Sequence, residues 1–392
     1  MLVLSERVRL LERNVFADMD RAKTEAINQG KKIIDLSLGS ADLSTAKPII
    51  EAIEKSLYNP ENHRYLLHGG TAEFRKVVAD WYQKRFGNYV DWETEVLPLI
   101  GSQEGSAHFP LAVINPGDYA LTLDPGYPSH AGGVYLASGQ VYAMPLLEEN
   151  NFLPQFADIP EAVLSKAKLM ILSYPHNPTT AIAPRSFFEE AFVFCKKHNL
   201  ILVHDFPYMD IYFGEERPIS VLEVDKNKEI SIEFFTFSKS YNMGGFRIGF
   251  AIGNSQLITA LRKIKSIVDF NQYRGILQGA ITALTSPQEC VAETVRIYRE
   301  RRDFLVSQLA KIGWQVPLPP ATLYVWAKLP SPWQQNSIRY CVELLKETGV
   351  ALSPGAGFGK YGEGYVRFAL VQPPEILAEA VAKIALFHQK TC

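Results

Sequence analysis

A single lysine between small hydroxyl residues is the clearest sign of chemistry in this sequence. Lys239 lies in the segment TFSKSYNMGGFR, residues 236–247, directly after an apolar strand-like run and before two glycines. A lysine amine forms a Schiff base with a carbonyl when burial or a nearby cation lowers its pKa. Arg247 could supply that cation or bind an anion. The segment therefore predicts a reactive amine beside a basic group.

Pyridoxal 5'-phosphate carries the aldehyde and the phosphate that such a site would bind, and it requires an acidic partner for its pyridinium nitrogen. Asp205 suits that requirement, because it follows the apolar run 201–203, and ligands of open α/β sheets lie at the carboxyl ends of strands. Tyr208 comes shortly afterwards. Asn177 lies between two prolines, which stiffen the turn and can orient its amide. The pattern predicts a cofactor pocket at one edge of a sheet.

The order and approximate spacing of these residues, with Arg367 further on, resemble the class I/II aminotransferases, which are pyridoxal-phosphate enzymes of fold type I similar to aspartate aminotransferase. The resemblance covers nearly the whole chain. It implies that Lys239 forms the internal aldimine and moves the proton at the substrate α-carbon, while Asp205 pairs with the pyridine nitrogen. Asn177 and Tyr208 are then expected to hydrogen-bond the ring hydroxyl. The implied catalytic residues are Lys239, Asp205 and Tyr208.

The same resemblance assigns the two arginines to anions. Arg247 is expected to bind the cofactor phosphate and Arg367 the substrate α-carboxylate, because a guanidinium suits both groups. The turn at residues 99–105 precedes an expected helix, whose N-terminal amides could also hold the phosphate. The expected cofactor contacts in these segments are Ser102, Gln103, Thr236 and Arg247.

Further pocket residues follow from the resemblance. Tyr127 would stack on the cofactor ring, and His130 would support the acidic residue from behind. Tyr65 would reach the phosphate of the neighbouring subunit, so we expect a homodimer. Gly39 lies where the family folds an N-terminal segment over the substrate. A packing aromatic, a structural histidine or a strand-ending glycine is the alternative in each case. The expected substrate contacts are Gly39, Asn177 and Arg367.

The elements that must position these residues follow from the apolar pattern. With 392 residues and 47% hydrophobic content, the chain can form two domains. Apolar runs alternate with amphipathic segments and predict a helix-covered, mainly parallel sheet of seven strands near residues 96–100, 119–123, 141–144, 169–172, 201–203, 234–237 and 248–252.

The C-terminal part has a different pattern. A charged amphipathic stretch at 294–312 leads into short strands near 322–327 and 365–369. We therefore expect an α/β fold of type I with two parts. Residues 45–285 form a large cofactor-binding domain, and residues 1–44 and 286–392 form an N-terminal segment with a smaller α/β domain.

Composition and residue spacing argue against several other classes of protein. The net charge of −2 offers no general basic surface for nucleic acid or an anionic membrane. No apolar run reaches the roughly 18 residues of a membrane span, and the N-terminus does not resemble a signal peptide, so we expect a cytoplasmic protein. The histidines show no metal-binding spacing and the cysteines no paired spacing, which predicts no metal and free thiols at Cys195, Cys290, Cys341 and Cys392.

The expected function is therefore ping-pong transfer of the amino group of an L-amino acid to a 2-oxo acid. The same fold and lysine also serve carbon–sulfur β-lyases and acyl-transferring synthases, although Arg367 favours transfer. A non-catalytic ligand sensor fused to a DNA-binding domain is disfavoured, because the N-terminus leaves no room for a helix-turn-helix domain.

The amino-acid substrate stays open at this point. Tyr324 is expected to border the side-chain pocket and suits both aromatic and acidic substrates. Aspartate, diaminopimelate-type compounds, alanine and aromatic amino acids are all compatible with the pattern. A second basic residue for a dicarboxylic substrate cannot be chosen by sequence among Arg64, Arg262, Lys263, Lys265 and Arg274.

Overall fold

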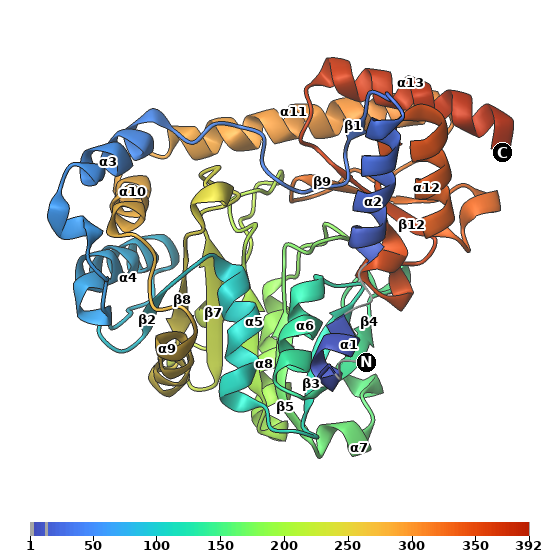
Figure 1. Cartoon of the computed structure of the whole chain (residues 1–392). Helices are drawn as coiled ribbons and strands as arrows, with labels where there is room; N and C mark the ends of the chain where they lie inside the picture. The colour runs from blue at the N-terminus through green and yellow to red at the C-terminus, as the bar shows by residue number, and fades with distance from the viewer. Residues whose placement is uncertain (1–3, 12–14, 392) are drawn as a thin grey trace.

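The structure is a computed structural model that describes residues 4–11 and 15–391. A seven-stranded sheet forms its centre, in the order β2-β8-β7-β6-β5-β3-β4 (Figure 1). Strand β8 is antiparallel to β2 and β7, and the other neighbouring pairs are parallel. The predicted seven-stranded, mainly parallel sheet is confirmed. Its strands are β2 (Val96–Leu99), β3 (Tyr119–Asp124), β4 (Gln140–Pro145), β5 (Ala167–Leu172), β6 (Ile201–Asp205), β7 (Ser231–Thr236) and β8 (Gly249–Gly253).

The central strands are apolar throughout because both faces of the sheet are covered. In β5, Met170 and Leu172 belong to one buried cluster, whereas Leu169 and Ile171 belong to another. Alternate residues of a strand point to opposite faces, so these two clusters are the two sides of the sheet. The covering helices are α4 (Ala72–Phe86), α5 (Ser102–Val113), α6 (Pro128–Leu136), α7 (Glu161–Leu164), α8 (Arg185–His198), α9 (Ser255–Val268) and α10 (Arg274–Thr285).

The C-terminal part forms a second core. The long helix α11 (Glu289–Lys311) leads into it, and a three-stranded antiparallel sheet joins β11 (Ser353–Pro354), β12 (Tyr365–Ala369) and β9 (Tyr324–Lys328) in that order (Figure 1). The N-terminal β1 (Ile34–Asp35) pairs in parallel with β10 (Val350–Ala351). The remaining helices are α1 (Glu6–Leu11), α2 (Val15–Asn28), α3 (Lys47–Leu57), α12 (Ser337–Thr348) and α13 (Pro374–Thr391).

The N-terminal segment joins this second core. Met19, Ile34 and Leu36 are buried in one cluster with side chains from residues 298–387, and α2 lies beside α12 in Figure 1. That cluster also takes in three residues that follow β6, namely Tyr208, Ile211 and Phe213. This packing agrees with a division into residues 45–285 and residues 1–44 with 286–392, which we retain as a proposal.

Two further expectations from the sequence concern membrane-spanning helices and the state of the cysteines. Among the helices of residues 4–11 and 15–391, none is long and apolar enough to cross a membrane. Cys195, Cys290 and Cys341 are free thiols, and Cys392 lies outside the described residues.

Candidate active site

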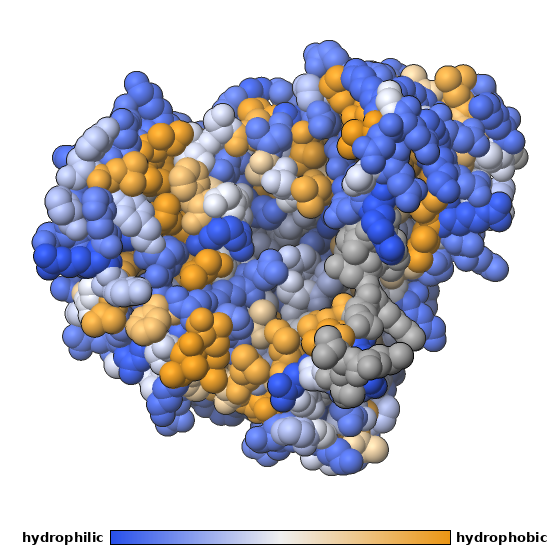
Figure 2. Space-filling model, in the orientation of Figure 1, coloured by the Kyte–Doolittle hydropathy of each residue, from blue (hydrophilic) through white to orange (hydrophobic). Residues whose placement is uncertain are grey.

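A cavity of about 460 Å³ opens where the carboxyl ends of the parallel strands meet the C-terminal part of the chain. Figure 2 shows this face of the molecule hollowed between its two halves. Residues from the ends of the central strands, from the Ser37–Ala41 segment and from the C-terminal sheet all line the cavity. The location agrees with the rule that ligands of open α/β sheets bind beyond the carboxyl ends of the strands.

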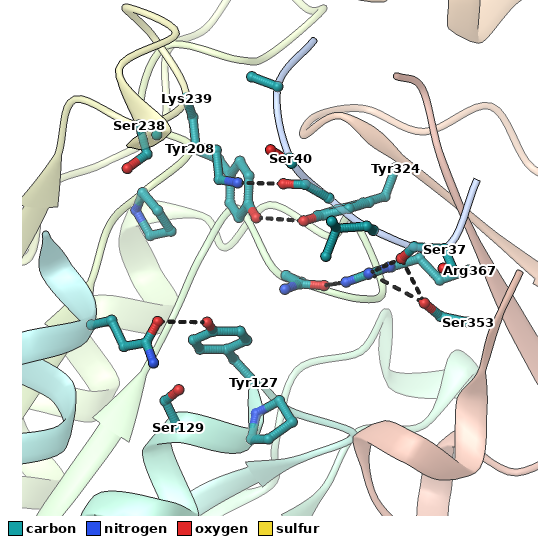
Figure 3. A pocket seen from close by; sticks show the side chains of 18 of the residues that line it. Ser37, Ser40, Tyr127, Ser129, Tyr208, Ser238, Lys239, Tyr324, Ser353 and Arg367 are labelled. Carbon is teal, nitrogen blue, oxygen red and sulfur yellow. Dashed lines mark hydrogen bonds between the residues drawn. The ribbon is translucent and has the colours of Figure 1, made fainter. Parts of the chain in front are cut away.

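Lys239 projects into this cavity from the loop that follows β7 (Figure 3). Its Nζ donates a hydrogen bond to the carbonyl oxygen of Gly39 at 2.6 Å and lies 6.0 Å from the centre of the Tyr208 ring. The local turn is held from within, because the Ser238 amide donates to Thr236 Oγ1 at 3.2 Å. The amine therefore lines the cavity and is hydrogen-bonded to the N-terminal segment that borders it.

Asp205 ends β6 and is only 3% exposed. Its Oδ2 lies 3.0 Å from His130 Nε2, as expected for a histidine that supports it. Its Oδ1 is buried and has no hydrogen-bond partner within the described chain. An unpaired carboxylate oxygen at this depth is costly unless a ligand satisfies it. Asp205 therefore has one acceptor available for a protonated ring nitrogen.

The expected anion site combines a helix end with a guanidinium. Ser102 begins α5, so the first amides of that helix have no intrahelical acceptor, and its dipole favours an anion there. Gly101 has φ of +75° and approaches Arg247 so closely that a Cβ would lie 2.8 Å from Nη2. Arg247 also donates to the Gly244 carbonyl at 3.1 Å. The hydroxyls of Thr236 and Ser238 line the same cavity.

Arg367 lies on β12 with its guanidinium between two aromatic rings. The group is 4.1 Å from the centre of Tyr324 and 4.7 Å from that of Phe358. Its Nη1 donates to Asn177 Oδ1 at 2.7 Å, and its Nη2 donates to the Ser37 carbonyl at 2.8 Å (Figure 3). Its Nε is buried without a partner within the described chain. The aromatic rings position the guanidinium, and Nε is left as a donor atom for a carboxylate.

Two tyrosines connect Arg367 with Lys239. The Tyr208 hydroxyl donates to the Tyr324 hydroxyl at 3.0 Å. Burial pushes the pKa of Tyr324 upward, but the positive charges of Arg367 and Lys239 outweigh it and hold that pKa below its usual range. Burial raises the pKa of Tyr208, so Tyr208 is the natural donor of the pair. A Cβ on Gly39 would overlap the Tyr324 hydroxyl, so this position requires glycine.

Tyr127 lines the cavity on the opposite side. Its hydroxyl donates to Gln103 Oε1 at 3.3 Å, and its ring meets the His130 ring edge to face at 5.7 Å. Tyr65, by contrast, is absent from the lining and is 93% exposed. Within one chain, the structure therefore brings the predicted residues together except Tyr65.

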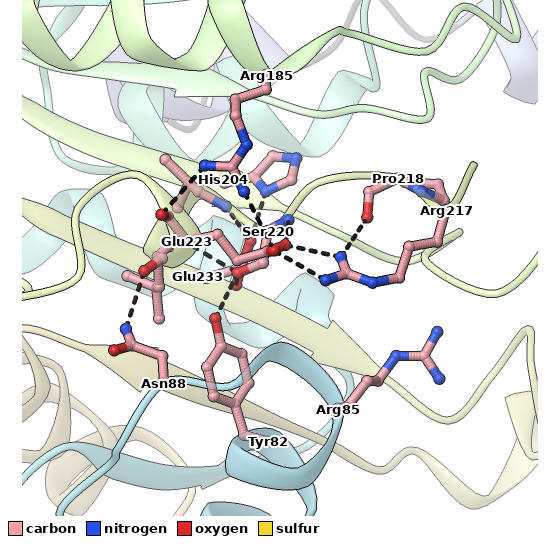
Figure 4. A network of polar contacts seen from close by, with 12 residues as sticks. Tyr82, Arg85, Asn88, Arg185, His204, Arg217, Pro218, Ser220, Glu223 and Glu233 are labelled. Carbon is pink, nitrogen blue, oxygen red and sulfur yellow. Dashed lines mark hydrogen bonds and ion pairs between the residues drawn. The ribbon is translucent and has the colours of Figure 1, made fainter.

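A buried polar network lies directly behind the Asp205 strand (Figure 4). His204 Nδ1 lies 2.6 Å from Glu233 Oε1, and its Nε2 lies 3.0 Å from the Tyr174 carbonyl. Glu233 also accepts from the Ser220 hydroxyl and from the Val221 amide at 3.0 Å. Since both ring nitrogens of His204 have hydrogen-bond partners, and Nε2 also lies 3.3 Å from the Tyr174 amide, the network fixes β6 and the chain that leads to the Asn177 turn.

Two sets of charged residues were missed by sequence reasoning. One is a cluster of the buried Glu104 with the half-buried His108 and Asp269, whose candidate ligand atoms lie within 4.8 Å of one another. Lys265 Nζ donates to Glu104 Oε2 and to Asp269 Oδ1, each at 2.9 Å, so one cation already bridges the two carboxylates. The Ile100 amide donates to Glu104, which ties this cluster to the loop before α5.

The other missed set is Asp20 and Lys23, which line the cavity from α2. No motif marks them, because α2 precedes every segment that carries recognisable chemistry. None of the five basic residues considered for a dicarboxylic substrate is part of the described lining. Those five are Arg64, Arg262, Lys263, Lys265 and Arg274.

The donor set fits pyridoxal 5'-phosphate. The unpartnered Asp205 Oδ1 suits a pyridinium nitrogen, the N-terminus of α5 with Arg247 suits a phosphate, and Lys239 suits an aldehyde.

Comparisons with known proteins extend over nearly the whole chain. The family described as aminotransferase class I and II matches residues 31–384. An LL-diaminopimelate aminotransferase of Aquifex aeolicus is 45% identical over 384 residues, which is 98% of this chain and 99% of that protein. Substrate-bound BacF of Bacillus subtilis superposes with a TM-score of 0.95 at 36% identity and covers 99% of this chain and 98% of that one. A probable N-succinyldiaminopimelate aminotransferase of Thermus thermophilus has a TM-score of 0.89, with 40% identity and coverage of 95% and 99%.

Proposed function

Because this chain belongs to the class I and II aminotransferases, which are fold type I enzymes that use pyridoxal 5'-phosphate, we propose that it transfers an amino group between LL-2,6-diaminopimelate and a 2-oxo acid. The observation that carries the choice of substrate is the 45% identity to an LL-diaminopimelate aminotransferase over 98% of the chain. The cavity supports it, because Arg367 offers a buried donor for a carboxylate.

The cofactor supplies an aldehyde that combines with amines and a ring that accepts the electrons released at the substrate α-carbon. We assign its ring nitrogen to Asp205, with His130 holding the carboxylate, and its ring face to Tyr127. Asn177 and Tyr208 would hydrogen-bond the ring hydroxyl, with the Tyr208 O–H turning to it from Tyr324. The phosphate contacts would come from Ser102, Gln103, Thr236, Ser238 and Arg247.

Lys239 would act as the general base. Once the incoming amine has displaced Lys239, its Nζ can take the proton from the substrate α-carbon. The same Nζ can then return that proton to a different atom on the same face of the substrate. Arg367 would bind the α-carboxylate with its buried Nε and so orient the α-hydrogen toward that base. Gly39 and its neighbours, which contact both Lys239 and Tyr324, would cover the substrate and exclude water.

The half-reaction offers a direct test of substrate and reaction class. The holoenzyme is mixed with LL-diaminopimelate alone, and the absorption of the cofactor is followed together with released oxo acid. Loss of the aldehyde form with one equivalent of oxo acid supports transfer. In a separate assay with a cysteine-type donor, release of pyruvate with ammonia or a thiol would support a β-lyase instead. In a third assay, reaction with N-succinyl-LL-diaminopimelate but not with LL-diaminopimelate would identify an acylated substrate.

The role of Lys239 is tested by substitution. Lys239→Ala should still bind some cofactor but lose turnover by orders of magnitude, because the other basic groups of the cavity, Asp205 and the Asp20–Lys23 pair, are committed to other partners. Lys263→Ala, which removes an exposed lysine, is the matched control. Turnover close to that of the unmodified protein would overturn the assignment.

We further propose a homodimer in which Tyr65 completes the neighbouring site. The exposed ring supports this, as do the exposed apolar side chains of Ile50, Leu57 and Leu67 in the same part of the sequence, and hydrophobic side chains gather over α3 and α10 in Figure 2. Mixed dimers of Lys239→Ala and Tyr65→Ala subunits regain one intact site only if Tyr65 acts across the interface. Activity that stays at the level of the separate variants would contradict that arrangement.

A further inference from the structure

Some charged side chains that line the cavity have no assigned contact with the cofactor or with the α-carboxylate of the substrate. In the described part of the chain, six charged residues line it. Four have assignments, since Asp205, Lys239 and Arg247 are directed at the cofactor and Arg367 at the α-carboxylate. The remaining two, Asp20 and Lys23, carry one negative and one positive charge, and both come from α2.

These two residues form an ion pair at the cavity wall. Lys23 Nζ lies 2.6 Å from Asp20 Oδ1 and 3.1 Å from Asp35 Oδ2, and it donates to Ser37 Oγ at 3.4 Å. The Lys23 side chain is 16% exposed, whereas that of Asp20 is 70% exposed. Asp35 is held separately, because its Oδ1 accepts from the Ser37 amide and hydroxyl. Asp20 is therefore the partner that can be exchanged.

Ser37 relates the ion pair to the α-carboxylate site. Its hydroxyl contacts Lys23, and its carbonyl oxygen accepts from Arg367 Nη2 at 2.8 Å. Ser37 and its two hydrogen bonds thus connect Lys23 with Arg367, and these two cations lie at a distance on the order of 10 Å. The terminal carbons of a seven-carbon diacid lie about 8 Å apart when extended. One such molecule can reach both cations.

We propose, on the basis of the function proposed above, that Asp20 and Lys23 form the subsite for the distal amino-acid group of LL-diaminopimelate. Lys23 binds the distal carboxylate and Asp20 the distal ammonium. The substrate carboxylate takes the place of the Asp20 carboxylate on Lys23, and Asp20 turns to the ammonium group. The Asp20–Lys23 ion pair is thus replaced by two ion pairs, Lys23 with the distal carboxylate and Asp20 with the distal ammonium, and no charge is left unpaired.

This subsite would distinguish LL-diaminopimelate from its N-succinyl derivative. Acylation of the distal amine with a succinyl group removes the positive charge and adds a carboxylate, which Asp20 would repel. The subsite therefore favours the free diamino acid over its N-succinyl derivative.

Four amino-group donors distinguish the contribution of the distal carboxylate from that of the distal amine. L-Lysine is LL-diaminopimelate without the distal carboxylate, L-2-aminopimelate lacks the distal amine, and L-norleucine lacks both. For Lys23→Gln we expect the kcat/KM ratio of LL-diaminopimelate over L-lysine to fall about tenfold or more, because a largely buried charge-assisted contact is lost. For Asp20→Asn we expect the ratio of LL-diaminopimelate over L-2-aminopimelate to fall about threefold, as suits an exposed pair.

Each ratio is taken within one protein, so partial loss of folded or loaded enzyme cancels. Glu25→Gln, an exposed change on the same helix outside the lining, should leave both ratios unchanged. A purely structural link between α2 and the N-terminal segment would lower kcat/KM equally for all four donors, and that result would overturn the subsite.

Equilibrium binding gives a readout without turnover. Pimelate has both carboxylates and no amine, so calorimetry on the holoenzyme should show a Kd about tenfold higher in Lys23→Gln than in Glu25→Gln. An equal Kd would contradict the role of Lys23. If the unmodified enzyme fails to convert LL-diaminopimelate, the proposed function fails; if it prefers this donor over L-norleucine and both ratios persist in the variants, only the subsite fails.

Discussion

His130 Nε2 lies 3.0 Å from Asp205 Oδ2, while the second oxygen of the same carboxylate is buried without a partner in the described chain. One oxygen is therefore anchored by the protein and the other is left for a ligand. This division of a single carboxylate fixes its orientation before the cofactor arrives, which is how a rigid scaffold preorganises a site.

The first prediction concerns that carboxylate. Asp205→Asn should keep the fold and lower kcat by about 10²- to 10⁴-fold, the range of a lost proton-holding group, because a neutral amide cannot stabilise a protonated ring nitrogen. His130→Gln should have a smaller effect, since the carboxylate remains. Steady-state kinetics with the cofactor spectrum measure both. Equal effects of the two substitutions would show that His130 does more than orient Asp205.

The second prediction concerns the close approach of Gly39 to Tyr324. Gly39→Ala places a methyl group on the Tyr324 hydroxyl, and overpacking of this kind costs about 1–3 kcal/mol of stability, so we expect a lower free energy of unfolding together with a lower kcat/KM. Adding Gly39→Ala to Tyr324→Ala should cost little more, because the clashing ring is gone. A double-mutant cycle measures the coupling, and strictly additive losses would refute the steric explanation.

The third prediction concerns the buried ion pair behind the helix α5 terminus. Lys265→Met leaves Glu104 buried with its lysine removed, which should lower the free energy of unfolding by about 3–5 kcal/mol. The double variant Lys265→Met with Glu104→Gln should recover much of that loss, because the deeply buried charge is removed and only Asp269, whose side chain is 21% exposed, keeps its charge without the lysine. Denaturant unfolding measures both proteins. A double variant as unstable as the single one would mean that packing, rather than charge, accounts for the loss.

The fourth prediction concerns pH. Burial, with a smaller contribution from His130, lowers the pKa of His176 to about 3. The unfolded chain takes up this proton as the pH falls through about 6.5, whereas the folded chain stays neutral until about pH 3. Stability from this group is therefore full above about pH 6.5 and is lost by roughly 1 kcal/mol per pH unit below it.

His176→Gln removes that titration, and its amide can still bond the Thr179 hydroxyl that lies 2.8 Å from His176 Nδ1. Between pH 7 and pH 4, the free energy of unfolding should fall more steeply for the unmodified protein than for the variant. Denaturant curves at each pH measure the difference, and parallel pH profiles would contradict a neutral buried histidine.

Much of this architecture was accessible from the sequence. The seven strands were predicted because doubly covered strands are continuous apolar runs, and Asp205 and Lys239 were recognisable because each follows such a run within a distinctive segment. The proximity of His130 to Asp205 was also expected. The long helix that was expected after Ser286, including residues 294–312, is α11 (Glu289–Lys311); it ends one residue earlier, since helix boundaries carry a weaker signal than helix centres.

Other features depended on the tertiary structure. Lys265 looked like an ordinary basic residue, yet it is buried against Glu104, a residue 161 positions away. Lys23 and Asp20 carry no motif, and they reach the cavity only because α2 packs with the C-terminal core. The sequence by itself determined the strands and the reactive segments, because these follow from local periodicity and turn chemistry. Which distant charges meet, and so which substrate end the pocket can bind, was decided by packing between segments far apart in the chain.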